Sequence, residues 1–292
     1  MKVLIIGNKG QLGYDLERQA EQYGFKPLGV DLPECNITRQ EEIARAVNNA
    51  GQPEVVINTA AYTAVDAAES DSETAFAVNR DGVGNVAHIC RKKSLPLIHV
   101  STDYVFDGLK ATAYDPSDPV NPQSVYGTSK AQGEDAVRRE TGQHIIVRTA
   151  WLFGLHGSNF VKTIIRLAKE KTELRVVDDQ IGCPTYCGDL AAALLKAAAM
   201  AVQHKPVWGT YHYTNKGPVT WYAFARRILA LASRRETFLV NDVLPVLTSQ
   251  INQVAQRPVC SILDCTTFEQ TFDVRRRNWT ASLKEMIDGL YL

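Results

Sequence analysis

The chain has 292 residues, enough for one large domain or two modest domains with a buried core. Its 32 basic and 32 acidic residues balance to zero net charge, which argues against a nucleic-acid or membrane surface as the partner. No apolar run reaches the roughly 18 residues of a membrane helix. The six cysteines lack zinc-like spacing, so we expect free thiols in a cytoplasmic protein.

The first element predicted is a buried parallel strand over the branched apolar residues 2–6. Gly7, Gly10 and Gly13 follow it at once, and a helical pattern then begins. A strand, a glycine turn and a helix N-terminus together form a site where backbone N–H groups can approach a pyrophosphate. We therefore predict dinucleotide binding here and no secretory leader, although the same spacing also suits an ordinary strand-to-helix turn.

The second predicted strand covers residues 27–30 and ends at Asp31. An acidic residue about 20 positions after such glycines can accept a hydrogen bond from the ribose 2′-hydroxyl and disfavours a 2′-phosphate. Asp31 is also a plausible cap of a helix or turn. Both interpretations are open from the sequence.

Further strand candidates lie at 55–58, 96–100, 145–149 and 174–177, with helical patterns at 40–50, 72–93 and 125–140 between them. This alternation predicts an α/β fold, a Rossmann-like doubly wound parallel sheet with a smaller C-terminal α/β domain. We assign residues 1–150 to a dinucleotide-binding domain, to which about 185–215 returns as a helix over 185–202 and a strand near 209–213. The substrate-binding domain then consists of about 151–184 and 216–292.

Three side chains suggest the chemistry. Tyr126 and Lys130 are four residues apart, so they share one face of a helix. A tyrosine has a pKa of about 10, and a neighbouring ammonium lowers it toward a value suited to proton transfer. Thr102, at a strand end, can donate its hydroxyl to a substrate carbonyl. Alone, Tyr-x-x-x-Lys is also a common surface pair, but the glycine turn and the threonine favour a catalytic set.

These motifs resemble the extended short-chain dehydrogenase/reductase family and, within it, the dTDP-4-dehydrorhamnose reductases. The resemblance runs nearly end to end. It is carried by residues 7–13, 58–66, 101–108, 126–130, 148–154, 159–160 and 179–185, and by Arg257-Pro258 with Ser261 and Leu263-Asp264.

The resemblance implies NADPH- or NADH-dependent reduction of the C4 ketone of dTDP-4-dehydro-L-rhamnose, in the biosynthesis of dTDP-rhamnose for polysaccharides. Thr102, Tyr126 and Lys130 match the family's catalytic positions, and Asp103 and Trp151 match positions that contact substrate. The cofactor-binding positions are Gly7, Gly10, Gln11, Leu12, Gly13, Asp31, Asn36, Ile37, Ala60, Ala61, Tyr62, Tyr126 and Lys130.

Several of these residues also have a purely structural interpretation. Ala60 and Ala61 follow an apolar strand, where small side chains permit either a close cofactor or ordinary tight packing. Trp151 follows another strand end, where its indole can cover a sugar or fill a domain interface. Arg257 can pair with a diphosphate or form a surface salt bridge.

Departures from the family pattern leave details open. An Asp-Ile or Asp-Phe pair that contacts adenine in the family is Asn36-Ile37 here. Asp31 favours NADH, whereas the resemblance implies NADPH as well, so we expect dual use. Some family members dimerise around a divalent metal, and Asp15 and Asp189 lie near the matching positions. We find no clear third acidic partner, so we predict no metal; a homodimer is compatible with the resemblance.

Two other functions are weighed against the reductase. One is a sugar-nucleotide epimerase or dehydratase of the same superfamily; a dehydratase needs an Asp-Glu pair after the threonine, whereas this chain has Asp103-Tyr104. The other is a non-catalytic NADP-binding regulatory subunit resembling the β subunit of methionine adenosyltransferase. The complete Thr102, Tyr126 and Lys130 set argues against a pure binding role.

Overall fold

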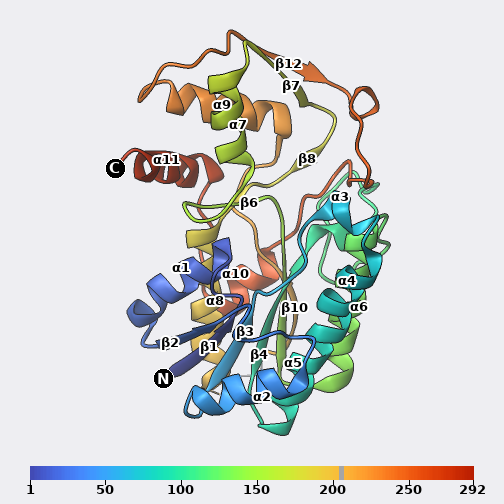
Figure 1. Ribbon diagram of the computed structural model, residues 1–292, viewed down its shortest axis with the longest axis vertical. Coiled ribbons are helices and arrows are strands. Elements are labelled where there is room, and N and C mark those ends of the chain that lie inside the picture. Colours follow the sequence, from blue (N-terminus) through green and yellow to red (C-terminus); the bar gives the residue numbers. More distant parts are fainter. Residues whose placement is uncertain (204–206) are drawn as a thin grey trace.

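A six-stranded parallel sheet lies in the lower half of the molecule, and a group of helices and short strands lies above it (Figure 1). The computed structural model describes residues 1–203 and 207–292. The strands are β1 Lys2–Ile6, β2 Lys26–Val30, β3 Val55–Asn58, β4 Leu97–Thr102, β5 His144–Thr149, β6 Leu152–Phe153, β7 Glu173–Val177, β8 Ile181–Gly182, β9 Thr185–Tyr186, β10 Gly209–His212, β11 Val219–Thr220 and β12 Asp242–Val246.

The helices connect these strands. The α-helices are α1 Gln11–Gln19, α2 Gln40–Asn49, α3 Val65–Ala68, α4 Ser72–Phe76, α5 Val83–Lys92, α6 Val125–Glu140, α7 Phe160–Glu170, α8 Cys187–Val202, α9 Trp221–Ala232, α10 Thr266–Phe272 and α11 Trp279–Leu290. Short 3-10 helices are η1 Ala20–Tyr23, η3 Asp103–Val105 and η4 Thr248–Gln250, and η2 Ala77–Gly82 is a π-helix. In the described ranges, no helix is long and apolar enough to cross a membrane.

The sheet has the order β10-β5-β4-β3-β1-β2, and all its pairings are parallel. Alternate residues of β1 enter different cores: Val3 and Ile5 pack in the cluster that contains α1 and α8, and Leu4 and Ile6 pack in the cluster that contains α2 and α5. A strand buried on both faces explains the unbroken apolar run at 2–6. The predicted doubly wound fold is confirmed.

The chain reverses its direction across the sheet between β1 and β3, since β2 lies outside β1 and the later strands lie beyond β3. Ligands of open parallel sheets bind at the carboxyl ends of the strands, at such a switch point. The glycine turn after β1 and the residues after β3 therefore meet where a ligand is expected.

The structure bears out two of the predicted strands and adjusts two of the predicted helices. The strand at 174–177 corresponds to β7, which pairs with β12 outside the central sheet, and the strand expected near 209–213 returns to that sheet as β10. The helix expected over 185–202 begins at Cys187, because Thr185 and Tyr186 pair with β6. The helix at 72–93 contains the π-helix η2, where the Asn79 side chain bonds both backbone groups of Tyr62.

A separate hydrophobic cluster forms above the sheet from α7, α9, α11, β7 and β9. It contains most of the region that we assigned to the substrate domain. The helix α10 differs, because Phe268 and Phe272 pack in the cluster between the sheet and α8 although residues 216–292 were assigned to the smaller domain. The two-domain division and its boundaries stay a prediction.

Candidate active site

A cavity of about 610 Å³ opens at the carboxyl ends of β1, β3, β4 and β5. This volume lies within the range of cofactor and small-ligand sites. Its lining includes these predicted site residues: Gly7, Gly10, Gln11, Leu12, Gly13, Asp31, Asn36, Ile37, Ala60, Ala61, Thr102, Asp103, Tyr126, Lys130 and Trp151. The fold thus brings together residues that are as much as 144 positions apart, from Gly7 to Trp151.

The glycine turn shapes one wall of the cavity. Gly7 has a φ of +88°, and a Cβ there would lie 2.6 Å from the backbone nitrogen of Ala60. A Cβ on Gly13 would overlap the carbonyl oxygen of Gly7. The helix α1 starts at Gln11 after Gly10, whose lack of a side chain leaves the first N–H groups without a side-chain cap. Such an N-terminus can bind the anionic phosphates of a ligand.

Asp31 lies at the edge of the cavity with its carboxylate already bonded to the backbone. Oδ2 accepts a hydrogen bond from the N–H of Lys9 at 3.1 Å, and Oδ1 accepts one from Leu32 at 2.8 Å. The turn-capping interpretation is therefore realised in the structure. Because Asp31 also lines the cavity, this role is compatible with contact to a ribose.

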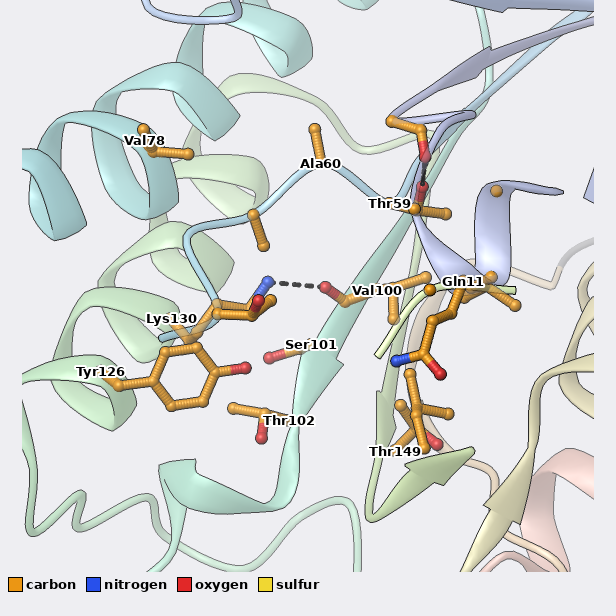
Figure 2. Close-up of a pocket in the computed structure, with 18 of the residues that line it drawn as sticks. Gln11, Thr59, Ala60, Val78, Val100, Ser101, Thr102, Tyr126, Lys130 and Thr149 are labelled. Carbon is orange, nitrogen blue, oxygen red and sulfur yellow. Dashed lines mark hydrogen bonds between the residues drawn. The ribbon is translucent and has the colours of Figure 1, made fainter. Parts of the chain in front are cut away.

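Tyr126 and Lys130 point from α6 toward the end of β4 (Figure 2). The helix is capped by Ser124, whose Oγ accepts a hydrogen bond from Gly127 at 3.1 Å. The Lys130 Nζ donates to the carbonyl oxygen of Val100 at 2.7 Å. Thr102 ends β4, and its hydroxyl donates to Asp103 Oδ1 at 3.0 Å. The three proposed catalytic side chains thus lie on two adjacent elements.

Burial dominates the electrostatics of this set. It raises the pKa of Tyr126 to about 12, and the hydrogen bond with Thr102 offsets only part of that rise. It lowers the pKa of Lys130 to about 8, against the attraction of Glu134. The Lys130 ammonium donates to the Val100 carbonyl in this structure, and the predicted lowering of the Tyr126 pKa by Lys130 stays a prediction.

Asp103 is a buried carboxylate next to the three proposed catalytic side chains. Burial raises its pKa to about 6, and the nearby hydroxyls of Ser261 and Thr102 oppose the rise. Among the described residues, its Oδ2 and the Thr149 hydroxyl are buried without a hydrogen-bond partner, and both residues line the cavity. Unpaired buried oxygens are costly, so they mark places where a ligand hydroxyl can donate.

Trp151 connects the cavity to the upper cluster. Its indole stacks on Trp221 with the ring centroids 3.4 Å apart and the planes 8° from parallel. Its φ of +48° is a conformation that bulky residues rarely adopt. The residue therefore packs against the upper cluster and also lines the cavity, while its contact with a sugar stays a prediction.

Three expectations have different outcomes. Tyr62 is not among the lining residues of this cavity, and its hydroxyl bonds Asp71 Oδ2 at 3.3 Å; its cofactor contact stays a prediction. Arg257 forms the alternative salt bridge, with Asp66 at 2.7 Å. All six cysteines are free thiols.

Asp15 and Asp189, the two carboxylates considered for a metal in the sequence analysis, each pair with an arginine. Asp15 accepts a hydrogen bond from Arg18 at 2.9 Å, and Asp189 accepts one from Arg277 at 3.0 Å. Each carboxylate is thus paired with the positive charge of an arginine. In the part of the chain that the structure describes, no group of three or more potential ligands could hold a metal.

Sequence reasoning missed several lining residues and the charges beneath them. The additional lining residues are Lys9, Leu32, Cys35, Thr59, Thr63, Val65, Val78, Val100, Ser101, Tyr104, Thr149, Ala150, Leu152, Gly157 and Ser158. Gly157 and Ser158 belong to a loop whose neighbour, Asn159, donates to Gln11 Oε1 at 2.9 Å. Few of these lining residues stand out in the sequence by spacing or type. Glu134 does not line the cavity, but its spacing of four residues from Lys130 could have drawn attention to it.

Comparison with known proteins agrees with this geometry. The family model described as the RmlD substrate binding domain matches residues 1–292. The chain belongs to this family. A dTDP-4-dehydrorhamnose reductase of Aggregatibacter actinomycetemcomitans is 39% identical over 98% of each chain. The spore coat polysaccharide biosynthesis protein SpsK of Bacillus subtilis is 38% identical over 98% of this chain and 96% of its own.

Solved structures of the family have the same fold. A dTDP-4-dehydrorhamnose reductase from Clostridium acetobutylicum superposes with a TM-score of 0.92 at 39% identity, over 100% of both chains. One from Bacillus anthracis, in complex with NADP, gives 0.91 at 36% identity over 99% of both. The resemblance noted in the sequence is confirmed, as is the prediction of an NAD(P)H-dependent oxidoreductase.

Proposed function

We propose that this protein reduces the C4 ketone of dTDP-4-dehydro-L-rhamnose to the alcohol of dTDP-L-rhamnose, with NADPH or NADH as the reductant. The observation that carries the proposal is the cavity at the switch point, in which Thr102, Tyr126 and Lys130 meet the glycine turn. The substrate is inferred from the relatives named dTDP-4-dehydrorhamnose reductase. As in the sequence-based prediction, a homodimer is compatible with this function.

The cofactor fits the wall formed by the glycine turn. The open N–H groups at the start of α1 suit the pyrophosphate, and Asp31 suits the adenosine ribose. Asn36 and Ile37 line the part of the cavity next to β2, where the adenine belongs, and Ala60 and Ala61 leave room for a close approach. When bound, the reduced nicotinamide supplies the hydride.

Tyr126 provides the proton that accompanies the hydride. The ketone carbon gains the hydride, the ketone oxygen gains the phenolic proton of Tyr126, and the resulting phenolate is stabilised by the Lys130 ammonium. A tyrosine pKa of about 12 without ligands favours the protonated acid at neutral pH. The approach of a cation to the phenolate lowers that pKa during the reaction.

Thr102 orients the carbonyl in this mechanism. Its hydroxyl donates to Asp103 in the structure, so it must turn away from Asp103 to donate to a ketone. The carboxylate that it leaves is then available to a sugar hydroxyl. We therefore assign Asp103 and Trp151 to substrate binding, the first as an acceptor and the second as an apolar surface for the sugar.

The residues of the upper cluster form the other side of the substrate site in this proposal. We retain the division into a dinucleotide-binding domain of 1–150 with about 185–215, and a substrate-binding domain of about 151–184 and 216–292. The nucleotide of the substrate is remote from the ketone, and binding of remote groups helps to position the reacting centre. A free 4-ketosugar without dTDP should therefore lose turnover as well as affinity.

A cofactor-oxidation assay tests the function directly. Purified protein is mixed with NADPH or NADH and dTDP-4-dehydrorhamnose made by the upstream enzymes, and the loss of absorbance of the reduced cofactor is followed. Formation of dTDP-rhamnose, identified by mass and NMR, supports the reductase. An isomerised or dehydrated product without net oxidation of cofactor indicates the superfamily alternatives, and binding without turnover indicates the regulatory-subunit alternative.

A further inference from the structure

Glu134 is a fully buried carboxylate that the proposed reaction does not use. It lies on α6 four residues after Lys130, so the two side chains share a helix face. Its side chain is 0% exposed. A charge at that depth is costly unless it is paired and hydrogen-bonded, so its partners show what it does.

Four hydrogen bonds hold the Glu134 carboxylate. Oε1 accepts from Ser101 Oγ at 2.6 Å and from Arg148 Nε at 2.8 Å. Oε2 accepts from Arg148 Nη2 and from Arg138 Nη2, each at 2.7 Å. Burial raises the pKa of Glu134, but the paired hydrogen bonds and the charge of Arg148 outweigh burial, so its pKa lies below the ordinary value. The group is therefore ionised at neutral pH.

The same carboxylate provides the negative charge for Lys130. The lysine is buried, which disfavours its charged form, and the attraction of Glu134 opposes that loss. Of the residues that the structure describes on the surrounding elements, no other ionisable group takes over the role of Glu134 as the negative charge for Lys130. These groups are His99 on β4, Tyr126 and Arg138 on α6, Asp103 at η3, Arg148 on β5 and His212 on β10. Burial keeps both histidines neutral, with pKa values well below ordinary, and Asp103 bonds Thr102.

Glu134 also fixes the strand end that the lysine contacts. Ser101, whose hydroxyl it binds, lies between Val100 and Thr102. The carbonyl of Val100 accepts the Lys130 hydrogen bond, and Thr102 belongs to the proposed catalytic set (Figure 2). One carboxylate thus acts on the lysine through its charge and on the two neighbours of Ser101 through a hydrogen bond.

We propose that Glu134 is a positioning residue of the active site, which keeps Lys130 protonated and aligned in its buried position. This inference rests on the role given to Lys130 in the proposed function. It predicts that loss of the negative charge, rather than loss of packing, lowers the pH at which Lys130 loses its proton and its function.

The test is Glu134→Gln, which keeps the shape and an acceptor oxygen but removes the charge. Turnover and the Kd for NADPH are measured between pH 6 and 9.5. On the alkaline side, turnover and cofactor affinity each fall as Lys130 loses its proton; we call this fall the alkaline limb. We expect its midpoint to move to lower pH by about one unit in both profiles, which makes NADPH binding at pH 8 about fivefold weaker. The cofactor arm needs no sugar substrate, so it can be measured whatever the sugar is.

Two matched variants separate charge from structure. Glu134→Asp keeps the carboxylate, so its alkaline limb should stay within a few tenths of a pH unit of the unmodified protein. Arg138→Gln removes the partially exposed outer partner and keeps the carboxylate, so its limb should not move to lower pH. If Glu134→Gln loses activity equally at every pH and its limbs do not move, the residue is structural and the inference is overturned.

A second variant covers the case in which Glu134→Gln fails to fold because Arg148 is left unpaired. Glu134→Gln with Arg148→Gln removes both charges of the buried pair. A limb below that of the unmodified protein supports the inference, and an unmoved limb overturns it. If the unmodified protein does not reduce the dTDP-sugar but the cofactor limb moves as expected, the proposed function fails and the positioning role stands.

Discussion

The two ends of the cavity differ in how much water reaches their charges. At the end of β4, Tyr126, Lys130 and Asp103 are all 9% exposed or less. At the rim near the end of β2, Lys9 of the glycine turn lines the cavity and forms a salt bridge with Glu34 at 2.8 Å, and the two side chains are 54% and 60% exposed. Exposed charges are screened and contribute little, whereas buried charges are governed by burial and by a few close partners. Substitutions at the buried end should therefore alter the chemistry, and those at the rim should alter selectivity by small factors.

The largest effect should come from Tyr126→Phe. The change removes one hydroxyl and should lower turnover by about 100-fold or more, the usual scale for loss of a general acid, without weakening cofactor binding. Steady-state kinetics and a fluorescence titration with NADPH measure the two quantities. Lys130→Ala is the matched comparison, because it should lower both. Near-normal turnover of the phenylalanine variant would remove Tyr126 from the mechanism.

Asp103→Asn should have opposite effects on function and stability. The pKa of Asp103 is raised from 3.8 to about 6, chiefly by burial, so the folded state binds its proton more tightly than the unfolded state. This contribution destabilises the fold as pH rises from about 4 to 6, and remains above 6. Two pKa units correspond to about 3 kcal/mol, an upper estimate of the stability that the neutral asparagine should gain at pH 7.

The same variant should raise the KM for the dTDP-sugar about tenfold, since a hydrogen bond to a charged acceptor is lost. Urea unfolding at pH 4 and pH 7 measures the stability, and kinetics measures the KM. The gain in stability should be present at pH 7 and absent at pH 4. If the variant is less stable at pH 7, the carboxylate is a structural group whose hydrogen bonds outweigh its burial.

Trp151→Ala should raise the KM for the dTDP-sugar by roughly tenfold, the scale of a lost aromatic contact, and leave the Kd of the cofactor unchanged. Trp151→Phe keeps a ring over Trp221 and should retain most of the affinity. Both quantities come from kinetics and cofactor titration. Unfolding of the alanine variant, or an equal loss of cofactor affinity, would assign Trp151 to the packing of the upper cluster alone.

The sheet and the meeting of Thr102, Tyr126 and Lys130 at its edge were predictable from the sequence for one physical reason. A buried parallel strand, a glycine turn and a helical Tyr-x-x-x-Lys each follow from short-range rules, and parallel strands bring their carboxyl ends to one edge. Gly7, Thr102 and Tyr126 could therefore be placed together without coordinates.

The upper cluster and the buried charges follow from contacts between distant segments. Trp151 stacks on Trp221, and Glu134 bonds Arg148 from another element; no local pattern specifies either pairing. The strand predicted at 174–177 corresponds to β7, but no local pattern indicates that its partner is β12, about 70 residues away.

The smallest effect should come from the exposed end. Asp31→Ala removes a negative charge beside the expected adenosine ribose, so the NADPH/NADH ratio of kcat/KM should rise about fivefold, equivalent to roughly 1 kcal/mol for a screened charge. The carboxylate also accepts hydrogen bonds from the N–H groups of Lys9 and Leu32, and both are lost in the alanine variant.

Asp31→Asn separates these two roles. Its single carbonyl oxygen can keep one turn bond but carries no charge, so it should shift the cofactor ratio nearly as far as alanine does while losing less thermal stability. Kinetics with both cofactors and a thermal unfolding curve measure the two effects. A ratio that stays constant in both variants, with a lower Tm in the alanine variant, would show that Asp31 serves the turn alone. The selectivity between NADPH and NADH would then have to come from the other groups of the rim, of which Lys9 carries the positive charge that a 2′-phosphate requires.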